Sequence, residues 1–264
     1  MLDISNISVT FNKGTPDAKT ALEDFSVHVN KGDFITIIGA NGAGKSTLFN
    51  AICGNFIVDK GRIVLDGQDV TFTPDHVRAK SIGRLFQDPM RGSAPNMSIE
   101  ENLALAAGRG SWFSMISRQD RALFRERLSL LDMGLEDRMK QPVGLLSGGQ
   151  RQALTLMMAT FNPPKLLLLD EHTAALDPGT AEKVLELTKR IVSESSITCM
   201  MVTHNMQSAI DLGNRLFMLN QGHLILDVSG QEKAALTVPT LVDMFRRKSG
   251  SELQTDRMLL TEQD

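Results

Sequence analysis

The fold is decided by the stretch Gly39-Ala40-Asn41-Gly42-Ala43-Gly44-Lys45-Ser46. The continuous apolar run Phe34–Ile38 precedes it, and Lys45–Cys53, which has helical spacing, follows, so the predicted order is strand, glycine-rich loop and helix. In this context the pattern G-x-x-x-x-G-K-[ST] predicts a phosphate-binding loop. Its glycines let successive backbone N–H groups point inward, and the helix N-terminus adds a positive dipole end. The alternative is a glycine-rich turn with a surface lysine; the spacing and both flanking elements favour the phosphate-binding loop.

Side chains suited to phosphate chemistry occur in this loop and again at a second predicted strand end. Lys45 would place its ammonium on the β- and γ-phosphates of a nucleotide, and Ser46 would give its hydroxyl to magnesium. The apolar run Leu166–Leu169 ends in Asp170 and Glu171. Asp170 is placed to orient the magnesium shell, and Glu171 to orient or deprotonate a water lined up on the γ-phosphorus. Alone, such an acidic pair could simply solvate a strand end; the phosphate-binding loop in the same chain favours the catalytic interpretation.

A third segment also suits a phosphate. Leu146-Ser147-Gly148-Gly149-Gln150 offers a hydroxyl, two glycines and the exposed amides of a helix N-terminus. Taken alone, it is at least as well interpreted as a flexible entry into a helix. A domain that already has one phosphate-binding loop needs this segment only if it meets a nucleotide held by another copy of the domain.

The composition indicates a globular chain with room for a full core. Its 264 residues are 42% hydrophobic and 22% charged, which excludes disordered and fibrous classes. The net charge of −3 provides no strong field for nucleic acid or anionic lipid. The longest strictly apolar run, Leu103–Ala107, is too short to span a bilayer, and the start lacks a secretory signal, so cytosolic residence is expected. Cys53 and Cys199 lack paired metal-ligand spacing and are predicted to be buried, reduced thiols.

The distribution of apolar residues predicts the organisation of the fold. Alternation over residues 7–11 and 25–29 indicates an antiparallel start, whereas buried runs such as Leu166–Leu169 and Thr198–Val202 alternate with helical patterns and indicate parallel strands. Between about Gln87 and Lys165 strands give way to helices with clear start signals. The capping-box starts in this block are Ser98 with Glu101 and Ser117 with Asp120. We therefore predict an α/β fold with a mainly parallel core sheet, an N-terminal antiparallel β subdomain and a helical insert.

The motifs GANGAGKST, LSGGQ and LLLLDE, in that order, resemble those of the nucleotide-binding subunit of an ATP-binding cassette (ABC) transporter, a P-loop NTPase, over about Ile4 to Val228. LSGGQ is the discriminating motif. The resemblance implies a head-to-tail dimer with two ATP molecules at its interface, each held by the P-loop of one subunit and the LSGGQ segment of the other. The ATP-binding residues that it implies in these two motifs are Gly39, Asn41, Gly42, Ala43, Gly44, Lys45, Ser46, Thr47, Ser147, Gly148, Gly149 and Gln150.

The same resemblance assigns four residues outside these motifs. Gln87 resembles the glutamine that touches magnesium and water and senses the permease, although a lone loop glutamine would be ordinary. His204 resembles the histidine that fixes the γ-phosphate and the attacking water. Asp177 resembles a residue of the segment that crosses between subunits, and is equally a helix N-cap. Phe11 resembles the aromatic residue that stacks on adenine, with a core residue as the alternative. The implied catalytic residues are Lys45, Gln87, Glu171 and His204, and the implied magnesium ligands are Ser46, Gln87 and Asp170.

The chain departs from the family pattern at two positions. It contains no tyrosine, so phenylalanine stands at position 11, where many relatives have tyrosine. His172 follows the catalytic glutamate where the family usually has proline, which concerns the local turn only. The histidines without an assigned role, His28, His76, His172 and His223, are expected at the surface.

The resemblance implies an ATP-hydrolysing motor subunit at the cytoplasmic face of the cell membrane. Its expected partners are a second copy of the subunit, integral membrane permease subunits and, indirectly, an extracytoplasmic substrate-binding protein, with no nucleic acid. Import is favoured because exporters commonly carry a glutamate-containing loop before LSGGQ, whereas this chain has Gln141–Leu145. The run Phe86–Met97 resembles the ATPases of tryptophan-like amino-acid importers. A soluble ABC ATPase that acts on ribosomes or nucleic acid is the alternative.

The predicted boundaries follow from these motifs. A single ABC ATPase domain is expected over residues 1–248, with the core at 1–86 and 165–228, the helical subdomain at 87–164, C-terminal helices at 229–248 and a flexible tail at 249–264.

Overall fold

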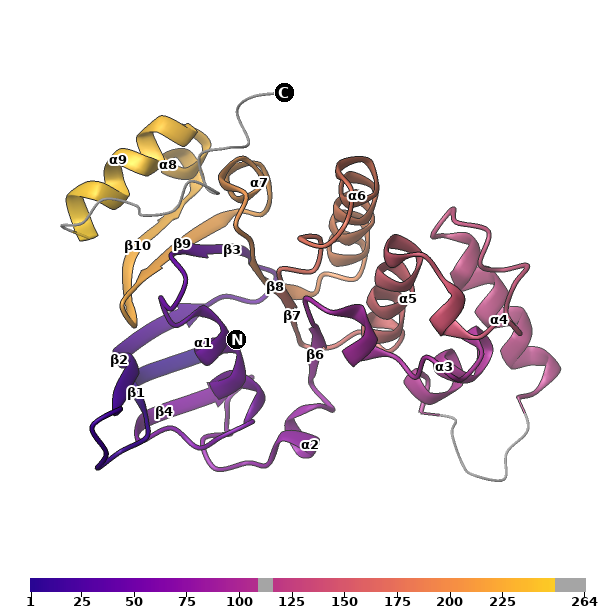
Figure 1. Ribbon diagram of the computed structural model, residues 1–264, viewed down its shortest axis with the longest axis horizontal. Helices are drawn as coiled ribbons and strands as arrows, with labels where there is room; N and C mark the ends of the chain where they lie inside the picture. Colours follow the sequence, from indigo (N-terminus) through magenta and orange to yellow (C-terminus); the bar gives the residue numbers. More distant parts are fainter. Residues whose placement is uncertain (109–115, 250–264) are drawn as a thin grey trace. The chain divides into compact units, whose positions relative to one another are not determined.

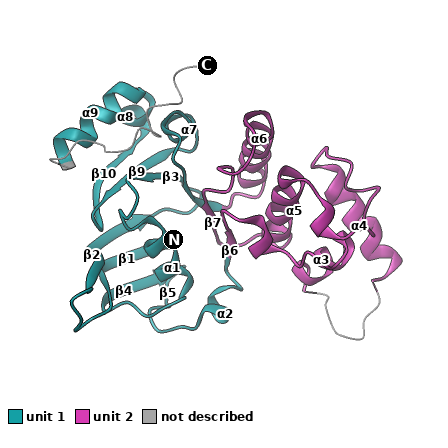
Figure 2. Ribbon diagram, viewed as in Figure 1, with its two compact units in different colours: residues 1–82, 198–264 teal, residues 83–197 magenta. Residues whose placement is uncertain are grey.

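The structure is a computed structural model and describes residues 1–108 and 116–249 (Figure 1). The chain divides into two compact units, residues 1–82 with 198–264 and residues 83–197 (Figure 2). The tail expected at 249–264 lies outside the described residues, apart from Ser249, the last residue of a helix. The boundaries of the core and the helical subdomain stay a prediction. Within the described ranges, no helix is both long and apolar enough to cross a membrane.

The first unit begins with an antiparallel sheet in the order β2-β1-β4-β5. Its strands are β1 (Leu2–Phe11), β2 (Lys19–Val29), β4 (Lys60–Leu65) and β5 (Gln68–Asp69). Leu2 pairs with Val29 and Ile4 with Val27, so the apolar residues of both strands share one buried face. The predicted antiparallel start is confirmed.

The first unit also contains four strands in the order β10-β9-β3-β8. They are β3 (Phe34–Gly39), β8 (Thr198–Val202), β9 (Arg215–Asn220) and β10 (His223–Ser229). β3 runs parallel to both β8 and β9, and β10 returns antiparallel to β9. The helices of this unit are α1 (Lys45–Cys53), α2 (Asp75–Arg78), α7 (Met206–Asp211), α8 (Gly230–Ala234) and α9 (Val238–Ser249). α7 contacts β3 and α9.

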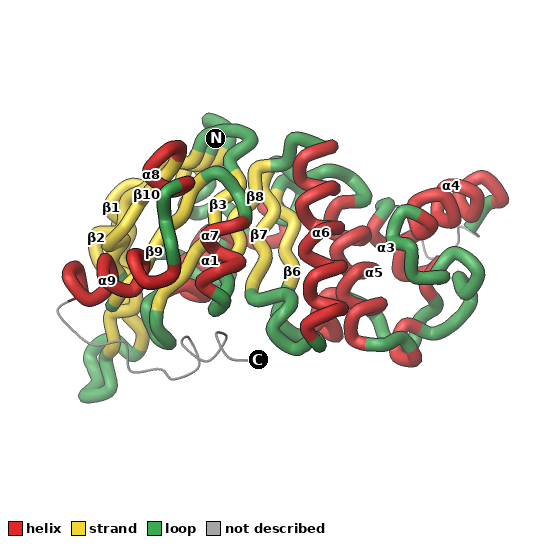
Figure 3. Tube along the Cα trace, turned by 90° about the horizontal axis from the view of Figure 1, so that it is seen from above, coloured by secondary structure: helices red, strands yellow, loops and turns green. Residues whose placement is uncertain are grey.

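The second unit is mainly helical. Two neighbouring strands, β6 (Ile82–Leu85) and β7 (Leu166–Asp170), accompany α3 (Ile99–Ala106), α4 (Arg118–Ser129), α5 (Gly148–Thr160) and α6 (Pro178–Glu194). Short 3-10 turns occur at Pro89–Gly92 and Val143–Leu145. α5 lies beside α6, and α3 and α4 pack against α5 (Figure 3). α3, α4 and α5 each begin with a capping box, two of which the sequence predicts. The predicted α/β fold is confirmed.

Candidate nucleotide-binding site

The glycine-rich loop joins β3 to α1 and is closely packed by its neighbours. A Cβ atom on Gly39 would lie 2.3 Å from the carbonyl oxygen of Leu219 on β9. A Cβ atom on Gly44 would lie 2.6 Å from the carbonyl oxygen of Ala21. Both glycines also have positive φ angles, +154° and +102°. The loop therefore requires glycine at these positions for both conformation and space.

Lys45 is the first residue of α1, and its ammonium lies inside the loop. Nζ donates to the carbonyl oxygens of Gly39 at 2.6 Å and of Ala40 at 3.1 Å, and only 6% of the residue is exposed. Ser46 is exposed, and no acidic residue lies in the first turn of α1. The helix therefore presents unopposed positive dipole charge, together with an ammonium, at the loop.

The opposite end of α1 is held by a buried arginine that the sequence did not reveal. Nη1 of Arg78 donates to the carbonyl oxygens of Ala51 and Ile52 at 2.8 and 2.9 Å. Its Nε donates to the carbonyl of Thr73 and its Nη2 to that of Thr71. Burial lowers the pKa of Arg78. One guanidinium thus joins the end of α1 to the segment before α2, and because its partners are all backbone carbonyls, no sequence motif marks it.

His204 lies at the same sheet edge as the glycine-rich loop. β3 and β8 are adjacent and parallel, with Ile37 paired to Val202, so the residues after each strand emerge at the carboxyl edge. His204 is half-buried between β8 and α7. The N–H of Thr203 donates to the carbonyl of Ile37 at 3.1 Å, and Asn205 caps α7 by accepting from the N–H of Ser208 at 2.7 Å. Hydrogen bonds of the Thr203 backbone and the Asn205 side chain therefore fix the chain on both sides of the histidine.

Phe11 ends β1 and is 42% exposed, so the core-residue interpretation is wrong. Its ring packs edge-to-face on Phe56 with the centroids 5.6 Å apart. An exposed ring held in this way can stack on a flat ligand.

In the second unit, β7 ends at the predicted carboxylates. Asp170 is half-buried and forms an ion pair with Arg84, whose Nη2 lies 3.3 Å from its Oδ2. Glu171 has a left-handed backbone with φ +48°, which is uncommon for a residue other than glycine. Its carbonyl accepts from the N–H of Ala174 at 3.0 Å. Such backbone conformations concentrate at functional sites, where the surrounding structure holds them.

His172 is buried, so the expectation that it lies at the surface is wrong. Thr188 of α6 donates its hydroxyl to the carbonyl of Val184 at 2.8 Å and accepts from Nε2 of His172 at 3.2 Å. This pairing selects the neutral imidazole with its hydrogen on Nε2. Burial lowers the pKa of His172 to about 4. A polar residue in a turn ordinarily faces solvent, and its partner lies sixteen positions along the chain, so no local signal predicts this contact.

Gln87 follows β6 and is exposed. One residue before it, the ring of Phe86 lies within cation–π distance of Arg84 and Arg91, whose guanidinium carbons are 4.8 and 4.9 Å from its centroid. The segment that carries the glutamine is therefore anchored through Phe86 and Arg84 to Asp170 of β7.

The LSGGQ segment forms the start of α5. The hydroxyl oxygen of Ser147 accepts from the N–H of Gln150 at 3.3 Å, and the N–H of Ser147 donates to Oε1 of Gln150 at 3.2 Å. Ser147 and Gly148 are exposed, whereas Gly149 is buried. A Cβ atom on Gly149 would lie 2.0 Å from Cγ2 of Thr180 on α6. The segment is thus a capped helix entry with a close helix–helix approach.

Asp177 is the N-cap of α6. Its Oδ1 accepts from the N–H of Thr180 at 3.1 Å, and hydrogen bonds from Thr180 lower the pKa of Asp177. The structure thus shows the N-cap role; the role at a subunit crossing stays a prediction.

A family model described as "ABC transporter" matches residues 22–174, more than half of the chain. This chain belongs to the ABC transporter family. It is 42% identical over 247 residues to "Tyrosine transport ATP-binding protein" of Clostridioides difficile, a match that covers 93% of this chain and 98% of that protein. It is 34% identical over 252 residues to "Methionine import ATP-binding protein MetN" of Streptococcus pneumoniae, covering 90% and 68% of the two chains.

Solved structures agree with this assignment. The dimeric ATP-binding cassette MJ0796, in a post-hydrolysis state bound to ADP and Pi, superposes with a TM-score of 0.75 and 27% identity over 87% of this chain and 98% of that one. The chain is therefore an ABC ATPase, an enzyme that binds and hydrolyses ATP. Its glycine-rich loop is the P-loop of this family.

Proposed function

We propose that this ABC ATPase is the motor subunit of a bacterial-type importer and drives uptake of a small solute, an amino acid, through a separate membrane permease. The similarity to the tyrosine transport protein carries the proposal, because it extends over 93% of this chain and 98% of that protein. The methionine import protein supports the same substrate class. The names of both relatives concern transport or import, and no feature of the described residues favours a role on ribosomes or nucleic acid.

Nucleotide binding is assigned to the P-loop and Phe11. Lys45 would exchange the carbonyls of Gly39 and Ala40 for oxygens of the β- and γ-phosphates, a short movement because all these groups line the same loop. The amides of the loop, from Gly39 to Thr47, would cradle the phosphates. The ring of Phe11 would stack on adenine.

Magnesium binding is assigned to the hydroxyl of Ser46, the carboxylate of Asp170 and the side-chain oxygen of Gln87. These groups fit the ion, because Mg²⁺ prefers hard oxygen donors and takes few of them from protein when phosphate oxygens and water complete its shell. When bound, the ion neutralises charge on the phosphates.

Hydrolysis is assigned to Glu171 and His204. Glu171 would accept a proton from, or orient, the water that attacks the γ-phosphorus in line, while His204 would hold the γ-phosphate and that water. No covalent intermediate is required, because positioning and charge stabilisation supply most of the catalysis in phosphoryl transfer.

The complete site is proposed to need two subunits arranged head to tail. Ser147, Gly148, Gly149 and Gln150 of one subunit would contact the γ-phosphate that the P-loop of the other holds, with Asp177 near the crossing. ATP would then favour the closed dimer, and hydrolysis would release it, since a ligand shifts a conformational equilibrium only through its different affinities for the two states. At the cytoplasmic face of the membrane this cycle would drive the permease, to which a binding protein delivers the solute.

The central test is Glu171→Gln. The variant is expected to bind ATP and to accumulate as a dimer in size-exclusion chromatography with ATP. Its rate of hydrolysis is expected to fall by about a hundredfold or more. Glu194→Gln, on an exposed residue at the end of α6, is the matched control and keeps the wild-type rate. Wild-type hydrolysis by Glu171→Gln would refute the assignment.

The shared site and the import direction are tested separately. Ser147→Arg is expected to bind ATP normally but to remain monomeric and inactive; normal hydrolysis would contradict the two-subunit site. Import is tested by co-purifying the chain with its permease and reconstituting both in vesicles. ATP supplied on the side of the ATPase should drive uptake of radiolabelled amino acids, and ATP-driven efflux or no amino-acid movement would reject this part of the proposal.

A further inference from the structure

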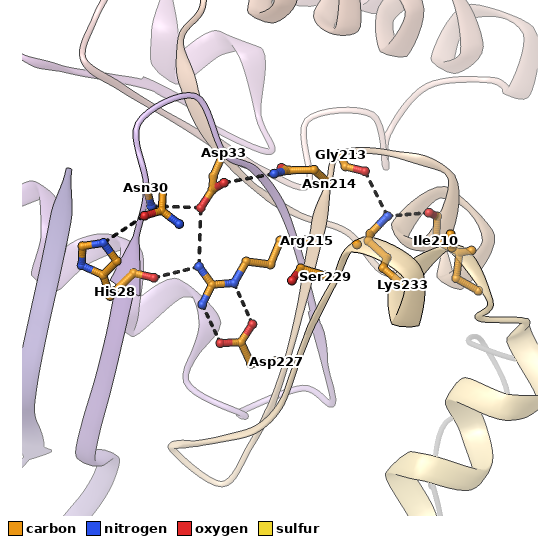
Figure 4. A pocket seen from close by; sticks show the side chains of 12 residues that line it. His28, Asn30, Asp33, Ile210, Gly213, Asn214, Arg215, Asp227, Ser229 and Lys233 are labelled. Carbon is orange, nitrogen blue, oxygen red and sulfur yellow. Dashed lines mark hydrogen bonds and ion pairs between the residues drawn. The ribbon is translucent and has the colours of Figure 1, made fainter.

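A polar cavity of about 820 Å³ lies in the first unit at the start of β3, the end of that strand opposite to the P-loop (Figure 4). Most of its charged groups bind one another. Arg215 makes a two-pronged ion pair with Asp227, at 2.7 and 2.6 Å, and lies 3.5 Å from Asp33. Asn214 donates to Asp33 at 3.0 Å. Because these groups satisfy one another, we interpret them as a structural link between strand ends and not as a ligand-binding site.

One cation in this cavity, the ammonium of Lys233, binds backbone carbonyls rather than these side chains. Lys233 of α8 is 4% exposed, and its Nζ donates to the carbonyl oxygens of Ile210 at 2.5 Å and Gly213 at 3.2 Å (Figure 4). It also donates to the carbonyl oxygen of Leu212 at 2.8 Å. An ammonium has three N–H donors, so these three carbonyls use all of them.

The carbonyl of Ile210 lies in the last turn of α7, and those of Leu212 and Gly213 directly follow the helix. The last carbonyls of a helix lack partners within the helix and carry its negative dipole end, which a cation stabilises. α7 has no basic residue in its own last turn. Lys233 supplies the missing cation from α8, and its charge matches this position.

The other end of α7 carries His204. The helix has six residues, Met206–Asp211, so at 1.5 Å per residue its two ends are only about 9 Å apart. Asn205 caps its first turn, and His204 immediately precedes the cap. A shift at the lysine end of so short a helix must therefore reach the histidine end, because the helix has too few turns to absorb it.

Apolar packing attaches α7 to the C-terminal helices as well. Met206 and Ala209 are buried in one cluster with Leu241, Val242 and Phe245 of α9. The helix is thus held between β3 on one side and the C-terminal segment on the other, with the Lys233 ammonium as the polar attachment.

We propose that Lys233 is a positioning residue for His204, and that α8 and α9 take part in ATP hydrolysis by fixing α7. The proposal rests on the proposed function, in which His204 holds the γ-phosphate and the attacking water. A misplacement of about 1 Å in a catalytic group can cost about a hundredfold in rate. Lys233 therefore acts on the chemical step while touching no nucleotide.

The experiment compares Lys233→Met with Lys233→Arg in the full chain at a temperature where both are folded. Lys233→Met fills similar volume without donors and is expected to lower kcat about tenfold or more, with the KM for ATP unchanged within about twofold. Lys233→Arg keeps the charge and donors and recovers most of the rate. Arg215→Met, in the same cavity but bound to Asp227 and Asp33 rather than α7, is the matched control: it lowers the melting temperature and leaves kcat within about twofold.

A double-mutant cycle with His204→Ala separates positioning from stability. If the lysine acts through the histidine, Lys233→Met slows the His204→Ala variant no further. Wild-type kcat in Lys233→Met, or losses that multiply in the double variant, overturn the proposal while the proposed function stands. A wild-type rate in His204→Ala alone removes the role of the histidine and this proposal with it. Should Lys233→Met not fold, Lys233→Gln, which retains two donors, replaces it and is expected to give an intermediate kcat, whereas a wild-type kcat would overturn the proposal.

Discussion

The buried imidazole of His172 makes stability depend on pH in a defined window. The pKa of a histidine in the unfolded chain is about 6.5, and burial lowers the pKa of His172 to about 4 in the folded chain. Between these values the unfolded chain binds a proton that the folded chain does not. The free energy of unfolding therefore keeps its full value, as far as His172 is concerned, above about pH 6.5 and falls as the pH drops toward 4. Each pH unit in this window costs about 1.4 kcal/mol, so about 2 kcal/mol of unfolding free energy is lost by about pH 5.

The assay is urea unfolding of the wild type and His172→Gln, without nucleotide, at several pH values between about 7.5 and 5. Glutamine can still donate to Thr188 but does not titrate, so the variant should lose about 2 kcal/mol less than the wild type over this range. His223→Gln, at an exposed position, is the control and should follow the wild-type profile. Parallel pH profiles of the wild type and His172→Gln would show that the imidazole is not buried and neutral.

Three further outcomes are expected. Arg78→Met should lower the free energy of unfolding by about 3 kcal/mol or more, because it strands buried carbonyls at the end of α1; a loss below about 1 kcal/mol in chemical denaturation would contradict this. Gly149→Ala should cost about 1 to 3 kcal/mol by overpacking, and Thr180→Ser in the same chain should recover most of it by removing the methyl group that a Cβ would strike; thermal unfolding of the single and double variants checks this. Burial raises the pKa of Cys199, so a thiol reagent should reach it only in denaturant, whereas the less buried Cys53 reacts first; two fast-reacting thiols in the native chain would refute the burial.

The sequence predicts those helices whose first residues form a recognisable motif, such as a capping box or a glycine-rich loop. Ser98 and Ser117 begin helices with the capping boxes that their sequences indicate, and the helix predicted at Lys45–Cys53 has those bounds. β4 was not predicted, because Lys60–Leu65 begins with charged residues and glycine, without clean alternation. A short strand of this kind forms through pairing with a distant neighbour, here β1, which local sequence does not encode.

The candidate site divides in the same way. Motif spacing predicts roles for Lys45, Asp170 and Ser147, because phosphate and metal chemistry restricts residue types at fixed intervals, and these roles stay predictions. Arg78 and Lys233 were missed, since each binds backbone carbonyls that any residue can supply. Structural partners of this kind become visible only when the fold brings distant segments together.

The capping box at α5 has a consequence for which residues can occupy position 147. The cap occupies a lone pair of the Ser147 oxygen and leaves its hydrogen to be given elsewhere. The Ser147 hydroxyl can therefore cap the helix and donate to an anion at the same time, without losing the capping hydrogen bond. Aspartate would cap the helix but repel an anion, and alanine would neither cap the helix nor donate to an anion. A small neutral alcohol such as serine can do both.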